Sequence, residues 1–474
     1  MTDFTPTDLE QIKSHGLTPD TVATQIENFK TGFPWSNIIS PCVIGNGIKH
    51  SYTDENADDF VAQYREHIND YNVVKFVPAS GAATRMFRDL FEFVNTGVRN
   101  KTTDMVLNNL NEFAFWNEIK QKMPENPSDE QIIRTITDTY GNSPKALIPF
   151  HRVDGVVRTP VAEHLIEGAK YAATNGISNI HFTVSPEHID GFNKLLSQIL
   201  PIYESQMGVR YNISMSTQKP QTDTIAVNPD NTPFRDDAGQ LLFRPAGHGA
   251  LIENLNDIDA DIVFIKNIDN VRPDITDTVR NKCFIGGVLI QYQNKIFEYL
   301  RAIDNGTANI PEITEFIKHD LCKDLPSPDI DSIRNILNRP LRVVGIVRNT
   351  GEPGGGPFWV RGNDDRVSLQ IVEPGQIAPE KRDILQKSEF FSPTDIVCGV
   401  RGYNGEKFNL LEFVDPTTGF ISDKSSNGRP LRAMERPGLW NGSMAGWNTI
   451  FATVPITTFT PVKVISDLLQ ATHK

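Results

Sequence analysis

The sequence predicts an α/β protein whose doubly wound mixed sheet carries helices on both faces. Two runs rich in β-branched and aromatic residues, residues 73–80 and 260–269, are typical of buried parallel strands. Helical patterns over residues 161–176 and 187–200 stand between these two runs. Because strands that alternate with helices form parallel βαβ units, we expect a parallel or mixed sheet covered on both faces.

Six further runs have the composition and length of strands. All of them are short and apolar, and turn residues lie between them and the helical patterns. The predicted strands cover residues 179–185, 211–217, 341–347, 367–373, 408–414 and 449–455.

Capping signals predict a helical extension at the amino terminus. Thr5 and Thr18 each precede a proline at a first-turn position, as helix N-caps often do. We therefore expect residues 1–70 to be an N-terminal helical extension and residues 71–474 to be one α/β domain. Helical insertions are predicted near residues 87–142 and 276–338.

Bulk composition excludes several classes of protein. The chain has 474 residues, 39% hydrophobic and 22% charged, and a net charge of -13, as expected for an ordinary globular protein. A nucleic-acid surface needs clustered Lys and Arg, so no nucleic-acid partner is expected. The longest apolar run, residues 283–290, is too short to span a bilayer, and no signal peptide is recognised, so a cytoplasmic location without membrane attachment is expected.

The four cysteines give no framework for a zinc site or for disulfides. They lie far apart and form no C-x-x-C pair. A reducing compartment is the default interpretation. The cysteines are Cys42, Cys283, Cys322 and Cys398.

A loop of small residues follows the strand predicted at 73–80. The residues of the Ser80-Gly81-Ala82-Ala83 run would let the backbone approach an anion, and Arg85 adds a cation suited to phosphate. The alternative is a tight strand-to-helix turn with a solvated arginine, because glycine-rich turns are weak evidence by themselves.

Two more segments allow both a functional and a structural interpretation. Lys145 follows a turn proline and could contact phosphate, but isolated lysines are mostly surface residues. Gly247 and Gly249 would let the backbone pass close to a flat ligand such as a base, but the same glycines could simply form a turn around His248.

A carboxylate stands where ligands of α/β sheets bind. Asp269 ends the apolar run at 260–269, and the carboxyl ends of parallel strands form the ligand crevice. Facing a polyphosphate, it is the expected Mg²⁺ ligand, although acidic residues also end strands for solubility. The pair Asp257 and Asp259 matches the D-x-D pattern of metal-dependent glycosyltransferases, but it lies at the amino end of the strand.

Late segments contain groups that suit a sugar. The glycines at 354–356, Trp359, Glu373 and Gln376 combine hydroxyl-binding groups with an aromatic face, though a surface hairpin is the alternative. Two tryptophans and two asparagines then lie in one glycine-broken stretch, residues 438–451, which is unusual for a plain core.

Together these segments resemble the UTP-dependent sugar-1-phosphate uridylyltransferases, the family of UDP-glucose and UDP-N-acetylglucosamine pyrophosphorylases. The late F-x-P-V-K-x-x-S-D-L-L run matches Phe459–Leu469 almost position for position. Ser80 and Ala83 replace glycines of the family's first loop, and a Cβ at Ala83 restricts the backbone if positive φ is required. The other similar segments are Ser80–Met86, Lys145, Ala246–Gly249, Asn267–Asn270, Gly354–Gly356 and Ile371–Ile377.

The resemblance implies a fold of the nucleotide-diphospho-sugar transferase (GT-A-like) type and assigns roles to residues. It implies catalytic cations, a nucleotide site, a sugar site, and a Mg²⁺ held by Asp269, with Asn448 as a second metal contact. The catalytic cations are Arg85, Lys145 and Lys463. The nucleotide-binding residues are Ala79, Ser80, Gly81, Thr84, Gln218, Gly247, His248 and Gly249. The sugar-binding residues are Gly355, Gly356, Glu373, Gln376 and Asn441.

In the implied reaction an NTP reacts with a sugar 1-phosphate and gives pyrophosphate and an NDP-sugar. UTP is the nucleotide that the resemblance favours. A nucleotide or NDP-sugar binding protein without turnover is the alternative, because two glycines of the first loop are replaced. A glycosyltransferase is a third reading, and it would depend on Asp257 and Asp259 in place of Asp269. The sequence does not define the sugar, the base or the oligomeric state.

Overall fold

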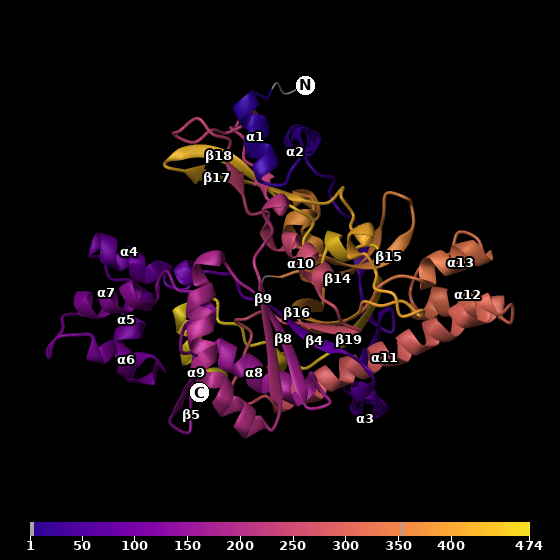
Figure 1. The fold of residues 1–474 in the computed structure, drawn as a ribbon, viewed down its shortest axis with the longest axis horizontal. Helices are drawn as coiled ribbons and strands as arrows, with labels where there is room; N and C mark the ends of the chain where they lie inside the picture. Colours follow the sequence, from indigo (N-terminus) through magenta and orange to yellow (C-terminus); the bar gives the residue numbers. More distant parts are fainter. Residues whose placement is uncertain (1–3, 352–353) are drawn as a thin grey trace. The chain divides into compact units, whose positions relative to one another are not determined.

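The chain folds into two compact units, each assembled from three separate stretches of sequence (Figure 1). The computed structural model describes residues 4–351 and 354–474. The GEPGGG loop is therefore described only in part, because Glu352 and Pro353 lie outside these ranges. Unit 1 comprises Met1–Asp54, Gln218–Asp261 and Val288–Thr453, and unit 2 comprises Glu55–Thr217, Ile262–Gly287 and Val454–Lys474.

Unit 2 is built on four parallel strands in the order β12-β4-β8-β9, with β7 antiparallel to β8. This order confirms that the strand runs predicted at 73–80, 179–185, 211–217 and 260–269 pair as parallel neighbours. The strands are β4 (Val73–Pro78), β7 (Ala173–Thr174), β8 (Ile177–Thr183), β9 (Arg210–Ser216) and β12 (Ile262–Ile265).

Two helices pack on this sheet and form the first core of unit 2. Helix α8 (Pro160–Tyr171) begins at Thr159, whose side chain accepts a hydrogen bond from the amide of Ala162. Its Leu165 packs with Phe182 of β8 and with Phe192 of α9 (Ile189–Met207) in one buried cluster. Five of the six residues of β4 are buried, as expected for a central parallel strand.

A second core of unit 2 joins four short helices to the end of the chain. Phe87, Phe115 and Ile133 are buried together with Val462 and Ile465 of the C-terminal stretch. The four helices lie close together in Figure 1 and occupy the insertion predicted at 87–142. They are α4 (Arg88–Thr96), α5 (Lys101–Asn108), α6 (Trp116–Gln121) and α7 (Asp129–Tyr140), and the C-terminal stretch adds the 3₁₀ helix Ile465–Leu469.

Unit 1 contains a mixed run of strands in the order β2-β3-β19-β13-β16, in which β16 is the antiparallel member. Strands β13 and β19 correspond to the runs predicted at 341–347 and 449–455. The members are β2 (Val43–Ile44), β3 (Gly47–Ser51), β13 (Leu341–Arg348), β16 (Phe390–Gly399) and β19 (Asn448–Thr453).

Strand β16 is fully buried although it contains a proline and an aspartate, and these two residues hid it from the sequence patterns. Its register against β13 shifts between Gly345 and Val347, and Thr394 takes a positive φ of 62°. The shift is a β-bulge that places Pro393 where no ladder hydrogen bond is required.

The remaining strands of unit 1 form a three-stranded antiparallel sheet and two ribbons. Residues 1–70, predicted as helical, therefore also contain β1, β2 and β3. The sheet has the order β1 (Asn37–Pro41), β14 (Gly356–Arg361), β15 (Val367–Val372), and the ribbons pair β10 (Thr224–Ile225) with β11 (Phe243–Arg244) and β17 (Phe420–Ser426) with β18 (Arg429–Glu435).

The two predicted N-terminal caps are confirmed. Helix α1 (Pro6–Ser14) begins with a capping box between Thr5 and Asp8, and the Thr18 side chain caps α2 (Pro19–Thr31). Both helices bury their apolar faces with Ile225 and Met434 of the ribbons.

The strand predicted at 408–414 is wrong. Leu410–Phe413 forms a 3₁₀ helix, in which Leu410 is buried while Leu411 is exposed. The amide of Leu410 donates to the side chain of Asn256, at the end of α10 (Leu251–Asp257), so this backbone has a partner other than a neighbouring strand. Apolar residues in a short run could not distinguish these outcomes.

The other helices include α3 (Ala57–His67) and the long α11 (Thr276–Asp304), which starts in unit 2 and ends in unit 1. Three shorter ones complete unit 1: α12 (Ile310–Glu315), α13 (Ile330–Leu337) and α14 (Asp383–Lys387). Within residues 4–351 and 354–474, no helix combines the length and apolar character needed to cross a membrane.

Adjacent glycines of α11 predict a contrast in stability. A Cβ at Gly287 would lie 2.0 Å from the carbonyl oxygen of Phe60, whereas a Cβ at Gly286 would first meet the ring of Tyr64. Gly287→Ala should therefore lower the free energy of unfolding by about 1–3 kcal/mol, despite a gain of about 1 kcal/mol in helix propensity. Gly286→Ala should cost less, because a ring can shift more readily than backbone. Urea unfolding compares the two variants, and a Gly287→Ala protein as stable as the wild type would contradict the packing.

Candidate functional site

Backbone hydrogen bonds join four segments of unit 2 near the carboxyl ends of β4 and β12. The segments are distant in sequence, and each carries one of the phosphate-type motifs found in the sequence. Each hydrogen bond fixes the position of one segment relative to another. The bonds run from the amide of Ala83 to Ser143 O (2.9 Å), of Lys145 to Gly81 O (3.4 Å), of Val462 to Asp269 O (3.0 Å) and of Ile465 to Met86 O (3.2 Å).

At the centre of these loops, one carboxylate oxygen accepts hydrogen bonds from two lysines. Lys145 Nζ lies 2.9 Å and Lys463 Nζ 3.3 Å from Asp269 Oδ2. Lys145 Nζ also donates to Val462 O at 2.7 Å. The side chain of Lys145 is 12% exposed and that of Lys463 is 59% exposed, so only one of the two cations is free to reorient in solvent. We call these three residues the lysine–aspartate group.

The lysines keep Asp269 ionised. Burial by itself would raise its pKa, but Lys145 and then Lys463 lower the pKa below the ordinary value. The group therefore carries one negative and two positive charges at neutral pH. That surplus of positive charge suits an anionic ligand.

A buried ion-pair cluster holds the strands beneath this group. Glu167 of α8 accepts from Lys75 of β4 at 2.9 Å and from Lys266, next to β12, at 2.6 Å. Burial lowers the pKa of Lys75 to about 7, although Glu167 opposes this shift. His164 Nε2 donates to Ile268 O at 3.3 Å, next to Asp269, so α8 supports the strand end from below.

This cluster was not predicted from the sequence, although two lysines in the sequence indicated it. Lys75 and Lys266 interrupt two otherwise apolar strand runs, and a lysine inside a buried strand needs a carboxylate partner. The partner, Glu167, lies on a different element and could not be identified without the fold.

The first loop projects into solvent above β4. Ser80, Gly81, Ala82 and Thr84 are exposed, whereas Ala79 is buried and its amide donates to Thr183 O. In the described part of the chain, no backbone acceptor binds the amides of residues 80–82. These three donors are placed where an anion could bind them.

Neither Ser80 nor Ala83, which stand where the similar family has glycines, takes a positive φ. Ala83 lies in the 3₁₀ helix Ala83–Arg85 and is not among the residues with positive φ. Its Cβ is buried in the second core of unit 2. The Arg85 side chain is exposed and makes no hydrogen bond or ion pair with any described residue.

A Mg²⁺ ion bound at Asp269 would have to take most of its ligands from substrate and water. Asn270 is already engaged, because its Oδ1 accepts from the amide of Thr460 and its Nδ2 donates to Thr458 O. Asp269 Oδ2 accepts from both lysines, so Oδ1 is the oxygen that a metal would use. No cluster of three or more His, Cys, Asp or Glu suited to a metal occurs among the described residues. Mg²⁺ at phosphates commonly uses only one or two carboxylates.

Asn448, the second predicted metal contact, lies in unit 1 at the start of β19. Its side chain is fully buried, and its Nδ2 donates to Ile336 O at 3.0 Å. The side-chain Oδ1 has no partner among the described residues. The side chain thus helps to connect α13 to the sheet of unit 1.

Unit 1 contains a second group, formed by His248, Trp440 and Glu373. The His248 and Trp440 rings stack with centroids 4.1 Å apart and planes 16° apart. Trp440 Nε1 donates to Glu373 Oε1 at 3.1 Å, and His248 Nε2 lies 3.8 Å from the same oxygen. We call these residues the histidine–tryptophan group.

Hydrogen bonding and burial define the protonation of this group. The amide of Leu439 donates to His248 Nδ1 at 3.0 Å, so the neutral ring carries its proton on Nε2. Burial lowers the pKa of His248 to about 4, although Glu435 opposes this shift. Burial also raises the pKa of Glu373, against the hydrogen bond from Trp440. At neutral pH the imidazole is therefore neutral and can act as a stacking surface and a donor.

A cavity of about 220 Å³ opens beside this group. Gln376 lines it and fixes the Glu373 backbone, since its Oε1 accepts from the Glu373 amide at 2.9 Å. Asn441 also lines it and donates to Ile371 O at 2.9 Å. The polar lining consists of His248, Glu373, Gln376, Glu435, Arg436 and Asn441.

The glycines that flank His248 pack against protein. A Cβ at Gly247, where φ is +72°, would lie 2.3 Å from Glu435 Oε2, and a Cβ at Gly249 would lie 2.1 Å from Pro437 O. Both glycines thus let the segment after β18 pack close to the loop, which brings Trp440 onto His248.

Three other predicted ligand residues have local partners. Gln218 Nε2 donates to Asp223 Oδ1 at 3.5 Å, and the Gly355 carbonyl accepts from the Ser392 amide. Gly356 is the first residue of β14 and pairs with Val372. None of these three residues lines the cavity beside His248.

The acidic residues of the D-x-D pattern are paired with cations of unit 1. Asp257 lies 2.7 Å from Lys219 Nζ. Arg401 pairs with both Asp259 and Asp261, the latter at 2.8 Å. Carboxylates in these pairs are poorly placed to bind a glycosyltransferase metal.

A buried histidine pair anchors the C-terminal stretch that carries Lys463. His473 Nδ1 lies 2.9 Å from His151 Nε2, and His151 Nδ1 lies 2.8 Å from Glu163 Oε1. His473 is only 3% exposed. Burial, then the His151 and Arg272 charges, lower its pKa to about 4. No local pattern in the sequence predicted this contact.

The chain is a mixed α/β protein. Unit 2 contains the lysine–aspartate group, whose positive charge suits an anion, and unit 1 contains a polar cavity beside the histidine–tryptophan group. The family model described as Domain of unknown function (DUF4301) matches residues 5–474, and the chain belongs to this family. No curated protein matches the sequence.

Two solved structures from Trypanosoma brucei are similar over most of the chain. The uridine diphosphate N-acetylglucosamine pyrophosphorylase, in complex with an inhibitor, is matched over 95% of this chain and 74% of its own length, with 11% identity and a TM-score of 0.49. The UDP-glucose phosphorylase is matched over 98% of this chain and 77% of its own, with 14% identity and a TM-score of 0.46. Likeness at this level assigns no activity to the chain.

The His473 anchor predicts a pH-dependent stability. His473 stays neutral in the fold until about pH 4, whereas its ordinary pKa is 6.5. The unfolded chain therefore binds the extra proton first, and stability falls as the pH drops from 6.5 towards 4, by roughly 1.4 kcal/mol for each pKa unit.

His473→Gln removes this titration and keeps a donor for His151. The urea midpoint of the wild type should fall relative to that of the variant as the pH drops from 7 to 4, because only the wild type loses stability through this titration. A difference that stays constant between pH 7 and pH 4 would show that His473 does not titrate in this way.

Proposed function

We propose that the chain is a sugar-1-phosphate nucleotidyltransferase that makes an NDP-sugar and pyrophosphate from an NTP and a sugar 1-phosphate. UTP is the nucleotide that the sequence resemblance favours. The observation that carries the proposal is the lysine–aspartate group, in which residues of three distant motifs meet at the carboxyl ends of parallel strands. Ligands of open α/β sheets bind in this position.

Phosphate would bind to unit 2. Lys145 and Lys463 would stabilise the α-phosphate and the incoming sugar phosphate, and Arg85 with the exposed amides near Gly81 would bind the β- and γ-phosphates. An oxygen of the sugar phosphate then attacks the α-phosphorus in line, and the bond to the pyrophosphate oxygen breaks. This chemistry needs positioning and charge neutralisation more than acid–base catalysis.

Mg²⁺ would bind through Asp269 Oδ1 and oxygens of the substrate. The ion would neutralise charge on the phosphates. In this arrangement Lys145, which has little exposure, keeps Asp269 ionised and fixed, whereas the more exposed Lys463 is able to move to the substrate.

The histidine–tryptophan group of unit 1 would bind a polar, ring-shaped ligand. Glu373, Gln376 and Asn441 supply acceptors and donors that hydroxyl groups can use. A neutral His248 stacked on Trp440 gives the cavity a flat apolar wall, which suits the face of a sugar or base.

A binding protein without turnover is the second candidate. The contact of both lysines with Asp269 favours it, because neither cation is then directed at a ligand. The exposure of Lys463 and the exposed first loop favour the enzyme. A glycosyltransferase is disfavoured by the pairing of Asp257, Asp259 and Asp261 with Lys219 and Arg401.

Pyrophosphate release tests the proposal. The protein is incubated with Mg²⁺, each of the four common NTPs and a panel of sugar 1-phosphates, with Asp269→Ala as the blank. Release above this blank would identify a nucleotidyltransferase and both of its substrates. No pyrophosphate release with any pair of substrates, together with a thermal shift on addition of UTP or a UDP-sugar, would support a binding protein without turnover.

Lys463→Ala provides the matching residue-level prediction. Loss of one well-placed donor to transition-state charge typically costs about 2.7 to 4 kcal/mol, so kcat should fall roughly 10²-fold or more. Lys122→Ala is the matched control, because Lys122 is an exposed lysine of unit 2 paired only with Glu118. Equal kcat for wild type and Lys463→Ala would remove Lys463 from the reaction.

A further inference from the structure

Three basic residues of unit 1 have no acidic partner. No described carboxylate lies within ion-pair distance of Lys323, Arg339 or Arg342. The chain has 59 acidic residues and 46 basic ones, so carboxylates are not scarce. Buried or half-buried cations are normally paired, because desolvating an unpaired charge is costly.

All three cations donate to carbonyl oxygens of one segment, residues 440–447. Lys323 Nζ binds Trp447 O at 2.9 Å, Arg339 Nη1 binds Gly446 O at 3.1 Å, and Arg342 Nη1 binds Trp440 O at 2.7 Å. Arg342 is completely buried, and its Nη2 has no partner among the described residues. Carbonyl dipoles satisfy some of the donors but supply no full negative charge.

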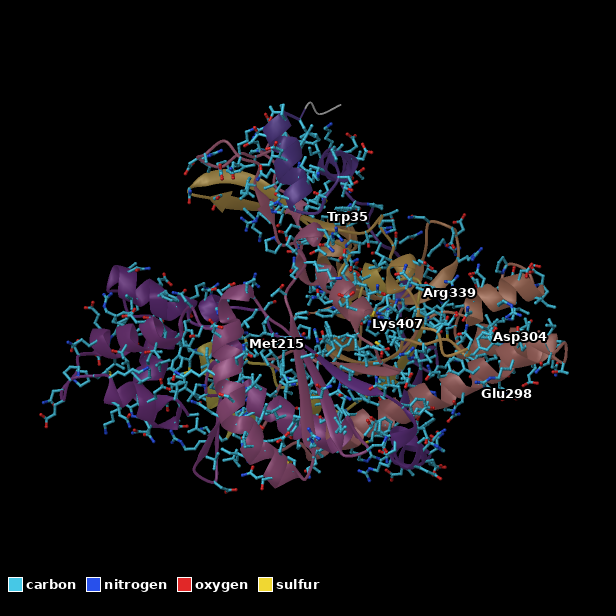
Figure 2. All side chains as sticks on the ribbon, in the orientation of Figure 1. Trp35, Met215, Glu298, Asp304, Arg339 and Lys407 are labelled. Atoms are coloured by element: carbon cyan, nitrogen blue, oxygen red, sulfur yellow. The ribbon has the colours of Figure 1, made fainter. Side chains whose placement is uncertain are left out.

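Two of these cations line a cavity of about 360 Å³ in unit 1. Lys323 precedes α13, and Arg339, which is labelled in Figure 2, follows it. The residues that line this cavity all belong to unit 1, whereas the lysine–aspartate group belongs to unit 2. Its polar lining includes Lys323, Arg339, Arg366, Gln370, Gln376 and Asn441.

Three carboxylates also line this cavity, but each has a local donor. Asp324 accepts from the amide of Val367 at 2.8 Å. Asp364 accepts from the Arg366 amide and lies 3.5 Å from Arg366 Nε. Asp415 accepts from the amide and hydroxyl of Thr417. None of the three forms an ion pair with Lys323 or Arg339, and Asp364 acts on both cations only from a longer distance.

We propose that this cavity binds the oxyanion, a carboxylate or a phosphate, of a small ligand that also carries hydroxyl groups, such as a sugar acid or a sugar phosphate. The anion would provide the missing partner for Lys323 and Arg339. Gln370 and Asn441 would bind the hydroxyls. Among the described residues, the Gln370 side chain forms hydrogen bonds only through its Nε2.

Neighbouring cations strengthen the case for an anion. Burial, then Arg339 and Arg342, lower the pKa of Lys323 well below its ordinary value, and only Asp364 opposes them. Burial and then Arg366 likewise lower the pKa of Arg339, and Asp364 again opposes them. A bound anion would reverse both shifts, so binding energy is available from relief of this repulsion.

The cavity adjoins the one beside His248, because Gln376 and Asn441 line both. A ligand held by the histidine–tryptophan group could therefore reach Lys323 with an acidic substituent. This deepens the proposed function by naming an acidic sugar as the substrate class, and it rests on that function for the identity of the ligand as a substrate. The oxyanion site itself is tested without nucleotide or turnover, so the two can fail separately.

Isothermal titration in the absence of nucleotide and Mg²⁺ tests the oxyanion site. The probes are glucuronate, glucose 6-phosphate, inorganic phosphate and glucose. We expect saturable binding of at least one sugar-bearing anion and no binding of glucose. The glucuronate and glucose 6-phosphate arms distinguish a carboxylate from a phosphate ligand, and binding of inorganic phosphate alone, or of no probe, would overturn the proposal.

Lys323→Met separates a ligand-binding lysine from a structural one. For the anion that binds the wild type, affinity should fall by about tenfold or more, because hydrogen bonds to charged groups are among the stronger ones. The urea midpoint without ligand should stay equal or rise, since an unpaired buried charge is removed. A lower midpoint with unchanged affinity would overturn the proposal.

Two further variants complete the test. Lys387→Met makes the same chemical change at an exposed lysine of unit 1 that is paired with Asp383, and it should leave anion affinity unchanged. Arg339→Gln provides a second test of the cavity if Lys323→Met does not fold, and it should also weaken the binding of the anion. Retention of full affinity in Arg339→Gln would contradict the proposal.

Discussion

The shared carboxylate of Asp269 is the interaction on which the candidate site depends. Two lysines from different loops converge on one oxygen, and both loops reach it because backbone hydrogen bonds join them to the strand end. The cluster of Glu167 with Lys75 and Lys266 holds that strand end from beneath. Unpaired, any of these buried charges would cost several kcal/mol, so the cluster constrains the sequence of β4, α8 and β12 together.

The two units solve different electrostatic problems. In unit 2 a buried carboxylate is kept ionised by surplus lysines, which suits phosphate. In unit 1 burial keeps His248 neutral and raises the pKa of Glu373, and the histidine–tryptophan group offers hydrogen bonds and a flat surface. Lys323 and Arg339 line the adjoining cavity, and no described carboxylate lies within ion-pair distance of either.

The sequence predicted the strands and loops that have strong local signals. Buried runs such as β4 and β13 and the caps at Thr5 and Thr18 were recognised from pattern alone. Strand β16 was missed because Pro393 is tolerated only through a bulge, and residues 408–414 were misassigned because a short apolar run fits either outcome. The mixed α/β class is confirmed.

For the site, the sequence identified Lys145, Asp269 and Lys463, and the structure brings these three together. It could not predict pairings between residues on distant elements, such as Glu167 with two lysines, His473 with His151, or the absence of a described acidic partner for Lys323. Such pairings depend on tertiary packing, which no local pattern encodes. The roles assigned from the resemblance remain proposals.

Binding of polyphosphate by the lysine–aspartate group can be measured by equilibrium titration of UTP into the wild type and into a Lys145→Ala, Lys463→Ala double variant, with circular dichroism as the check on folding. We expect UTP to bind the wild type and the double variant to lose most of this affinity. Equal affinity in the two proteins would show that UTP binds without these two cations and that the lysine–aspartate group is not its site.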